Sequence, residues 1–209
     1  MNEKYPQVLF KNRKPDRIAT IDEYRQSGGY EALTTVLKNH SPKDVTKMVL
    51  DSKLLGRGGA GFPAGQKWMT VADDAPFPRY MVTNIHEMEP GTFKDRLLAH
   101  ADPHLIIEGT LLASYAVSAT KAFLFIRPSY ETSALILDRE VRIAREAGFW
   151  GKNILGSGYS LELVVHRSGG DTFAARARPN STPSRGRGPT PGLFPPTPRT
   201  KAFGPGPRC

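Results

Sequence analysis

The spacing of apolar and polar residues predicts three short helices in the first fifty residues. Thr20 and Glu23 have the spacing of a capping box, and the helix that they begin ends at Gly28. Two further helices are predicted over Tyr30–Asn39 and Pro42–Ser52, because apolar side chains recur there every three to four residues. The chain therefore starts with a helical segment.

Beyond this segment, the pattern alternates between short apolar runs and longer amphipathic stretches. The apolar runs predict strands over Arg79–Thr83, Ala122–Arg127 and Leu161–His166. Helices are predicted between them, over Pro103–Ala119 and Ser129–Ala147. The inner side of the second of these helices is predicted to carry Leu135, Leu137, Val141 and Ala144. Crossovers of this length require parallel strand pairing, so the predicted fold is α/β, a Rossmann-like parallel sheet with flanking helices.

The stretch from Ser168 to Cys209 differs in composition from the rest. It holds nine of the eighteen prolines, and from Asp171 on it has seven basic residues and one acidic. Most of the net charge of +9 therefore lies in this Pro/Gly/Arg-rich stretch, and only +3 belongs to the residues before it. We expect one domain over residues 1–167 followed by an irregular tail over 168–209, and the charge distribution disfavours a nucleic-acid-binding face.

Membrane insertion and disulfide chemistry are both disfavoured. The longest apolar stretch, Leu105–Ala119, is interrupted by Glu108, and the N-terminus has no apolar signal core. Cys209 is the one cysteine, which excludes an internal disulfide or a cysteine-rich metal site. We expect a cytoplasmic protein with no metal site.

The most informative stretch, called the glycine-rich loop below, is Gly56–Gly65, which contains five glycines in ten residues. Its G-x-G-x-x-G pattern is a weak signal, since a dinucleotide fingerprint follows a strand and this one follows a predicted helix. A P-loop is excluded because Trp68 stands where Ser or Thr is needed after Lys67. Glycines let backbone N–H groups approach an anion, and Arg57, Phe62 and Lys67 add charge and a ring face. The alternative is a flexible linker.

A second informative stretch, Asn84–Arg96, follows the first predicted strand. Its first part, Asn84–Glu89, is called the acidic turn below. Glu87 and Glu89 lie at the carboxyl end of that strand, where ligands of open α/β sheets bind. The alternative is a surface turn whose carboxylates neutralise Lys94 and nearby charges. His86 and His104 lack companions at metal-ligand spacing, so we interpret both as surface or packed histidines.

Together these stretches resemble a known family. The matching residues are Gly56–Pro63, Lys67-Trp68, Asn84, Glu87, Glu89–Arg96, Asp102–His104 and Gly151–Gly158. In this order they resemble the FMN- and NADH-binding flavoprotein subunit of respiratory complex I, which is NADH:quinone oxidoreductase. The similarity runs from about residue 10 to Arg167.

The resemblance implies cofactors and site residues. FMN and NAD(H) would share one pocket, in which hydride passes from the nicotinamide to the flavin; the protein supplies placement and charge, with no catalytic side chain. Phe62 would stack on the dinucleotide, Lys67 and Asn84 would contact FMN, and Glu87 and Glu89 would lie on the NADH side. The cofactor-binding residues implied are Gly56, Arg57, Gly58, Gly59, Ala60, Gly61, Phe62, Pro63, Ala64, Gly65, Lys67, Asn84, Glu87 and Glu89.

Departures from the family pattern occur at few positions before Arg167 and at many after it. His86 stands where the family has Asp and Thr70 where an aromatic is frequent, changes that would weaken NADH binding more than FMN binding. After Arg167, Arg176 and Ala177 replace two carboxylates, and the spacing of the family returns near residue 193. We interpret this as a pair of compensating frameshifts, which resequencing of the coding DNA tests. The cysteines that hold a 4Fe-4S cluster in the full-length family are not among these residues.

The resemblance also implies partners and a location. These are the neighbouring iron–sulfur subunits of complex I and a peripheral position on the inner face of the cell membrane, and the chain by itself would be inactive. Two alternatives are a diaphorase subunit of an NAD-linked hydrogenase or formate dehydrogenase, and a non-catalytic basic binding module.

Overall fold

The computed structural model describes residues 8–14, 16–71 and 73–169. The described elements, in chain order, are α1 (Ile21–Gln26), α2 (Glu31–Asn39), α3 (Pro42–Asp51), α4 (Ala64–Met69), β1 (Tyr80–Ile85), α5 (Lys94–Ala101), α6 (Pro103–Ala116), β2 (Lys121–Ile126), α7 (Glu131–Glu146), a 3₁₀ turn (Ile154–Gly156) and β3 (Glu162–Arg167). The predicted α/β class is confirmed.

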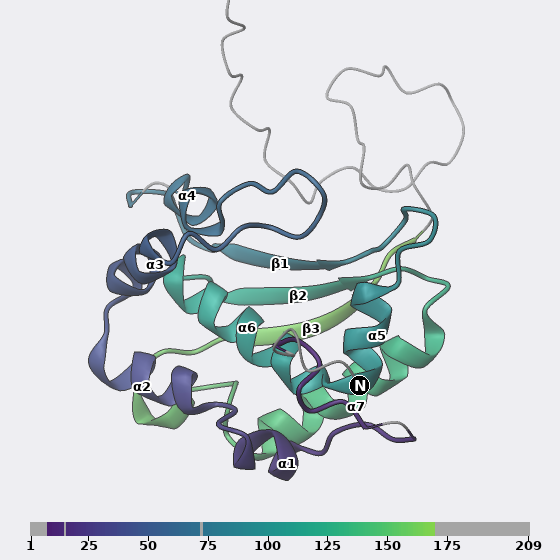
Figure 1. The fold of residues 1–209 in the computed structure, drawn as a ribbon. Coiled ribbons are helices and arrows are strands. Elements are labelled where there is room, and N and C mark those ends of the chain that lie inside the picture. Colours follow the sequence, from purple (N-terminus) through teal and green to yellow (C-terminus); the bar gives the residue numbers. More distant parts are fainter. Residues whose placement is uncertain (1–7, 15, 72, 170–209) are drawn as a thin grey trace, which may run out of the picture.

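The three strands form one parallel sheet in the order β1-β2-β3 (Figure 1). Tyr80 pairs with Lys121, and Lys121 pairs with Glu162, so all three strands start in line. Their carboxyl ends consequently lie at the same edge of the sheet, the edge from which the acidic turn leaves β1.

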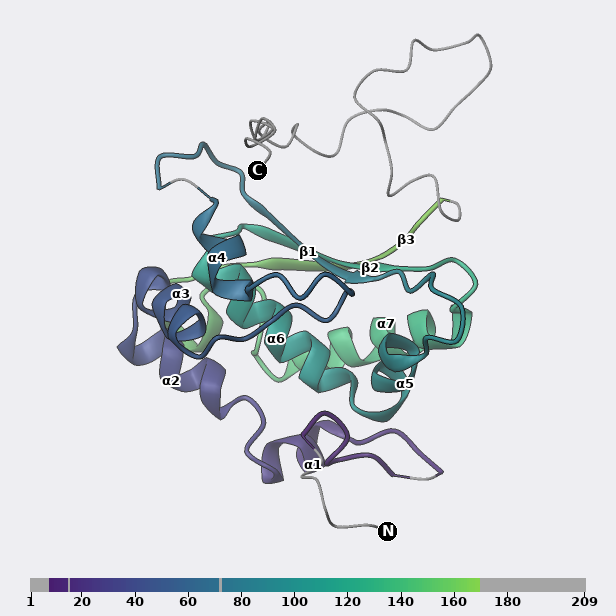
Figure 2. The ribbon, with the colours of Figure 1, turned by 45° about the horizontal axis from the view of Figure 1, so that its top comes forward.

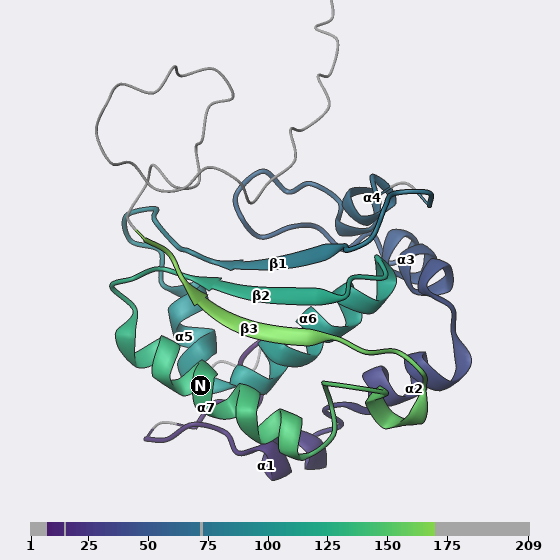
Figure 3. The same ribbon diagram turned by 180° about the vertical axis from the view of Figure 1, so that it is seen from behind.

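The helices α5, α6 and α7 cover one face of this sheet, and α1 and α2 pack beyond them (Figures 1 and 2). The core between these layers contains Leu124 and Ile126 of β2, Ile107 and Leu111 of α6, and Leu137 of α7, all of them buried. Among the described residues no helix lies across the middle of the opposite face, which carries Tyr80 and Val82 of β1 (Figure 2). Figure 3 shows β3 as the outer strand on the far side from β1.

The predicted strands and the three N-terminal helices are confirmed within about two residues, and two features were wrong. Helices α4 and α5 were not predicted, because α4 starts inside the glycine-rich loop and α5 starts at Lys94, shortly after the acidic turn. Leu135, predicted on the inner side of α7, is 63% exposed. Since helix positions advance by 100° per residue, Leu135 and the buried Leu137 lie too far apart on the helix to share one face. The predicted tail lies outside the described residues except for Ser168 and Gly169.

The N-terminal helices are held to the core by Glu108 of α6. Its carboxylate is buried and accepts hydrogen bonds from the Tyr24 hydroxyl at 2.5 Å, the Tyr30 backbone N–H at 2.9 Å and the Leu33 N–H at 3.2 Å. Tyr30 precedes α2 in a left-handed conformation and has no side-chain cap of its own. Glu108 therefore supplies the missing N-cap of α2 from a distant part of the chain.

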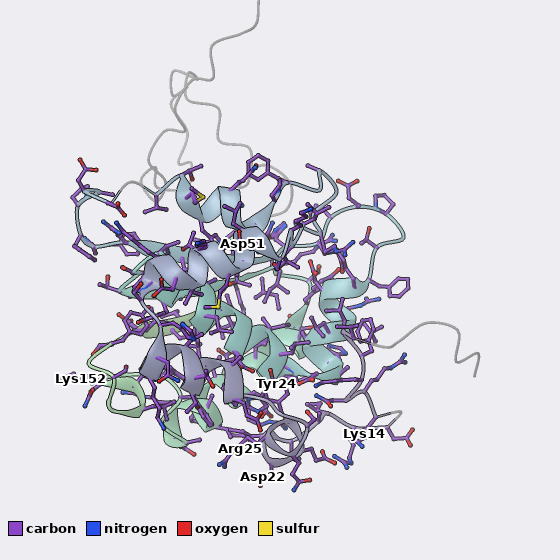
Figure 4. All side chains as sticks on the ribbon, turned by 60° about the vertical axis from the view of Figure 1, so that its left-hand side comes forward. Lys14, Asp22, Tyr24, Arg25, Asp51 and Lys152 are labelled. Carbon is purple, nitrogen blue, oxygen red and sulfur yellow. The ribbon has the colours of Figure 1, made fainter. Side chains whose placement is uncertain are left out.

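Two further buried groups extend this network. His104 lies 2.9 Å from the Tyr30 hydroxyl through Nδ1 and 3.0 Å from a Glu140 carboxylate oxygen through Nε2. His104 was expected to be a surface or packed histidine, and it is packed, with no exposed surface. Figure 4 places Tyr24 on the side of α1 that faces the molecule, with Asp22 and Arg25 on its outer side. Burial, followed by the Glu108 carboxylate, raises the pKa of Tyr24, so its hydroxyl remains a donor.

Candidate functional site

The glycine-rich loop is a hairpin-like excursion between α3 and α4. Leu55 and Pro63 form an antiparallel bridge at its base, and the Gly56 N–H donates to the Phe62 carbonyl at 2.8 Å. The Ala64 N–H donates to the Leu54 carbonyl, also at 2.8 Å. A loop closed in this way has a defined base, and the residues beyond the base, Arg57 to Ala60, are exposed. The linker alternative is therefore disfavoured.

The structure requires glycine at some positions of this loop and not at others. Gly59 and Gly61 have φ values of 113° and 63°, a region that residues with a Cβ rarely adopt. Gly65 is buried, and a Cβ there would lie 2.5 Å from the backbone of Leu50, so this glycine lets α4 approach α3. Gly58 has neither constraint, because a Cβ would meet nothing within 4 Å. The outward side of the loop backbone is consequently open at Gly58.

The side chains proposed to accompany the loop are exposed. The Phe62 ring is 53% exposed although it is large and apolar. Lys67 lies on α4 and is exposed, as is Arg57 at the start of the loop. An exposed ring and two exposed cations within one short stretch of chain have the chemistry to contact a flat anionic ligand.

Glu87 in the acidic turn is buried and held from three sides. Its side chain is 3% exposed and accepts a hydrogen bond from the Asp95 N–H at 3.3 Å. The Lys94 ammonium lies 3.7 Å away, and the Tyr130 hydroxyl donates to the other carboxylate oxygen at 3.4 Å. The carboxylate therefore has a fixed orientation and a paired charge, as a buried carboxylate requires.

Sequence reasoning missed two residues in these surroundings. The Arg127 guanidinium donates to the Glu87 carbonyl at 3.2 Å, and Tyr130 binds its carboxylate. Arg127 directly follows β2, at the edge of the sheet where the acidic turn leaves β1. The pairing of adjacent parallel strands was a signal that pointed to this position.

The other acidic-turn residues differ in exposure. Glu89 is exposed, and its carbonyl accepts a hydrogen bond from the Thr92 N–H at 3.1 Å. Asn84 is exposed on the uncovered side of β1, and its side-chain oxygen accepts from the His86 N–H at 2.9 Å. The His86 ring stacks on Phe125, with centroids 5.5 Å apart. Of the two glutamates, Glu89 is the one with a carboxylate open to a ligand.

The glycine-rich loop and the acidic turn both lie at the β1 edge of the sheet. The loop runs beside the outer edge of β1 and its tip points toward the carboxyl end of that strand, where the acidic turn starts (Figures 1 and 2). The described residues contain no group of three or more His, Cys, Asp or Glu side chains with the geometry to hold a metal ion. In this part of the chain, no helix is long and apolar enough to cross a bilayer.

Comparison with known proteins identifies the family. The family model of the Nuo51 FMN-binding domain matches residues 49–177, which include both the glycine-rich loop and the acidic turn. The chain belongs to this family.

Curated relatives of the Nuo51 family chain are F subunits of NADH-quinone oxidoreductase. The one from Aquifex aeolicus is 43% identical over 94% of this chain and 46% of its own length. The one from Escherichia coli is 40% identical over 90% of this chain and 43% of its own length. The chain thus spans about half the length of the curated relatives it matches.

Solved structures similar to this family member belong to another assembly. A chain of NAD+-reducing [NiFe]-hydrogenase in the H2-reduced state aligns with a TM-score of 0.54 and 32% identity. The alignment covers 71% of this chain and 25% of that one, and the air-oxidised state gives a TM-score of 0.55. These likenesses agree with a three-stranded parallel sheet flanked by helices.

Proposed function

We propose that this chain is the front part of an NADH dehydrogenase flavoprotein subunit that transfers hydride from NADH to FMN. The observation that carries the proposal is the open backbone of the glycine-rich loop, pointing along β1 toward the acidic turn. Residues 1–167 would form the FMN- and NADH-binding domain, which is incomplete in comparison with the longer relatives.

The residues present fit a flavin nucleotide by their chemistry. Gly58 leaves space that a Cβ would fill, and the exposed Phe62 offers a ring face for stacking. The loop would provide backbone donors from Arg57, Gly58, Gly59, Ala60 and Gly61. Its closing residues Gly56, Pro63, Ala64 and Gly65 would set the base. Lys67 would add a positive charge for the phosphate.

The acidic turn would complete the pocket. Asn84 offers a side-chain amide at the carboxyl end of β1, and Glu89 offers an exposed carboxylate for hydroxyl or carboxamide groups of NADH. Glu87, held by Lys94 and Tyr130, would fix the turn and the orientation of its backbone. FMN, when bound, supplies the conversion of a two-electron hydride donor into single electrons.

Partners and location follow from the same proposal. Electrons would leave for iron–sulfur clusters of neighbouring complex I subunits, on the inner face of the cell membrane. This chain alone would lack NADH:quinone oxidoreductase activity, because the clusters that accept the electrons would belong to other subunits. The flavin half-reaction is therefore the step to test.

A diaphorase of an NAD-linked hydrogenase is the second candidate. The similarity to NAD+-reducing [NiFe]-hydrogenase favours it, and the curated NADH-quinone oxidoreductase relatives, which have higher sequence identity, favour the first.

The proposal can be tested with this purified chain. The protein is mixed with FMN and then with NADH under anaerobic conditions. Flavin that co-elutes with the protein and is bleached by NADH supports it; protein that leaves all flavin free contradicts it. Glu89→Gln should impair bleaching at low NADH with little change in retained flavin, and Glu146→Gln, another exposed carboxylate, serves as the control. Colourless protein that retains single-stranded DNA through a salt wash would instead support a basic binding module.

A further inference from the structure

A second hollow, separate from the glycine-rich loop, opens where α5 meets the start of α7. Its volume is about 880 Å³. The lining residues include Arg96 and His100 of α5, Arg127 just after β2, Tyr130 just before α7, and Thr132 and Ser133 in the first turn of α7. We call it the cationic hollow.

Two guanidinium groups converge on one ring in this hollow. The central guanidinium carbon of Arg96 lies 5.6 Å from the centre of the Tyr130 ring, and that of Arg127 lies 5.8 Å from it. Like charges held near one ring repel each other, and a bound anion offsets that repulsion. Among the described residues that line the hollow, Glu131 is the one carboxylate, and it is exposed.

His100 adds a third nitrogen-bearing side chain to the same wall. It is hydrogen-bonded to the Ser133 hydroxyl, with the two atoms 2.8 Å apart. Burial, and then the positive charge of Arg96, lowers the pKa of His100. Because burial is the larger cause, the charge that favours an anion comes from the two arginines, and His100 adds a polar side chain to the wall.

The position of the hollow in the fold agrees with ligand binding. It lies at the carboxyl end of β2, the central strand, where α/β sheets bind ligands. The 16-residue helix α7 starts there, and the residue before it, Tyr130, provides no side-chain cap. The Thr132 and Ser133 side chains line the wall as hydroxyl groups of the kind that bind phosphate oxygens.

We propose that the cationic hollow binds a phosphate group, with Arg96 and Arg127 as its charged contacts and the first turn of α7 as the hydrogen-bonding wall. This goes beyond the proposed flavin chemistry and does not depend on it. Tyr130 separates the hollow from Glu87, to which its hydroxyl donates, so a bound phosphate lies one side chain away from the acidic turn.

Calorimetric titration of the full chain with inorganic phosphate, at constant ionic strength, tests the proposal. Wild type should show saturable phosphate binding, and Arg96→Gln should weaken it about tenfold or more, as loss of a charge-assisted contact does. Arg142→Gln removes an exposed arginine from a later turn of α7 and should leave the affinity unchanged. The absence of saturable binding to wild type, or equal affinity in Arg96→Gln, overturns the proposal.

Two further arms locate the anion and its source. Lys67→Gln removes the charge that the proposed flavin site offers to a phosphate, so it reports on that other site. If the affinity falls in this variant and not in Arg96→Gln, the phosphate binds at the glycine-rich loop and the proposal is overturned. Adenosine monophosphate replaces phosphate in the last arm. Tenfold tighter binding with the same Arg96 dependence supports a nucleotide phosphate as the ligand, and equal binding supports free phosphate.

Discussion

Polar groups are buried and paired where the N-terminal helices pack on the core, whereas they are exposed along the glycine-rich loop. Around Glu108 the polar groups are buried, and the carboxylate has three donors within 3.2 Å. Along the loop the residues between Arg57 and Ala60 are exposed, and the backbone at Gly58 faces open space. Buried polar groups must be paired because their desolvation is otherwise uncompensated. Exposed polar groups are hydrated by water and remain available to bind a ligand. The difference separates residues that hold the fold from residues available for binding.

Replacing Glu108 by Ala should have the largest effect on stability. Three buried donors would lose their acceptor, so we expect the free energy of unfolding to fall by about 3 kcal/mol. Urea denaturation monitored by circular dichroism measures the change. Glu146→Ala, an exposed glutamate on α7, should stay within about 0.5 kcal/mol of wild type. Equal effects in the two variants would mean that Glu108 does not cap α2.

Two glycines of the loop sharpen the comparison between packing and binding. Gly65→Ala places a Cβ against the Leu50 backbone, so unfolding should become easier by about 2 kcal/mol. Gly58→Ala meets no neighbour and should leave stability within about 0.5 kcal/mol, while flavin retention on the protein falls. Thermal unfolding and flavin absorbance read out the two effects. Normal flavin retention in Gly58→Ala would contradict the role given to its open backbone.

Phe62→Ala tests the exposed ring. The free energy of unfolding should change by less than about 0.5 kcal/mol, and the affinity for NADH should fall about tenfold through lost stacking. Flavin fluorescence, followed as NADH is added, measures that affinity. Phe77→Ala, another exposed phenylalanine, is the control, and an equal loss of affinity there would argue against stacking at Phe62.

Glu140 should give the smallest effect, a change in the dependence of stability on pH. Burial opposes its ionisation, but hydrogen bonds from His104 and Arg139 outweigh burial and hold its pKa below the ordinary 4.5. A carboxyl whose pKa is lowered on folding stabilises the protein above its unfolded pKa and loses that contribution as pH falls. Unfolding free energies from pH 6 to pH 3.5 should therefore decline less steeply in Glu140→Gln than in wild type. Identical slopes would contradict the assignment, and Glu146→Gln should follow wild type.

Apolar periodicity predicted most of the fold, because the strands and the α6 and α7 crossovers bury continuous runs of side chains. It failed where local composition hid the element. The short α4 starts at Ala64, inside the glycine-rich loop, and Leu135 is apolar yet faces solvent on α7. A pattern of residue types cannot show which face of a helix its neighbours leave open.

The candidate site was only partly predictable for a related reason. The glycines and the acidic turn are contiguous in sequence, so their motifs are visible there. The partners of Glu87 come from two other elements, with Tyr130 43 residues away in the chain. Glu108 looked like an interruption of an apolar helix, since its donors on α1 and α2 lie more than 70 residues earlier. Pairing between distant polar groups leaves no periodic signal.

The cap supplied by Glu108 sets an order on events during synthesis. Tyr30 leaves the ribosome 78 residues before the carboxylate that its N–H will meet. At elongation rates of about 5–20 residues per second, α2 exists for several seconds without its acceptor. The beginning of this polypeptide therefore completes its structure only after the middle has been translated.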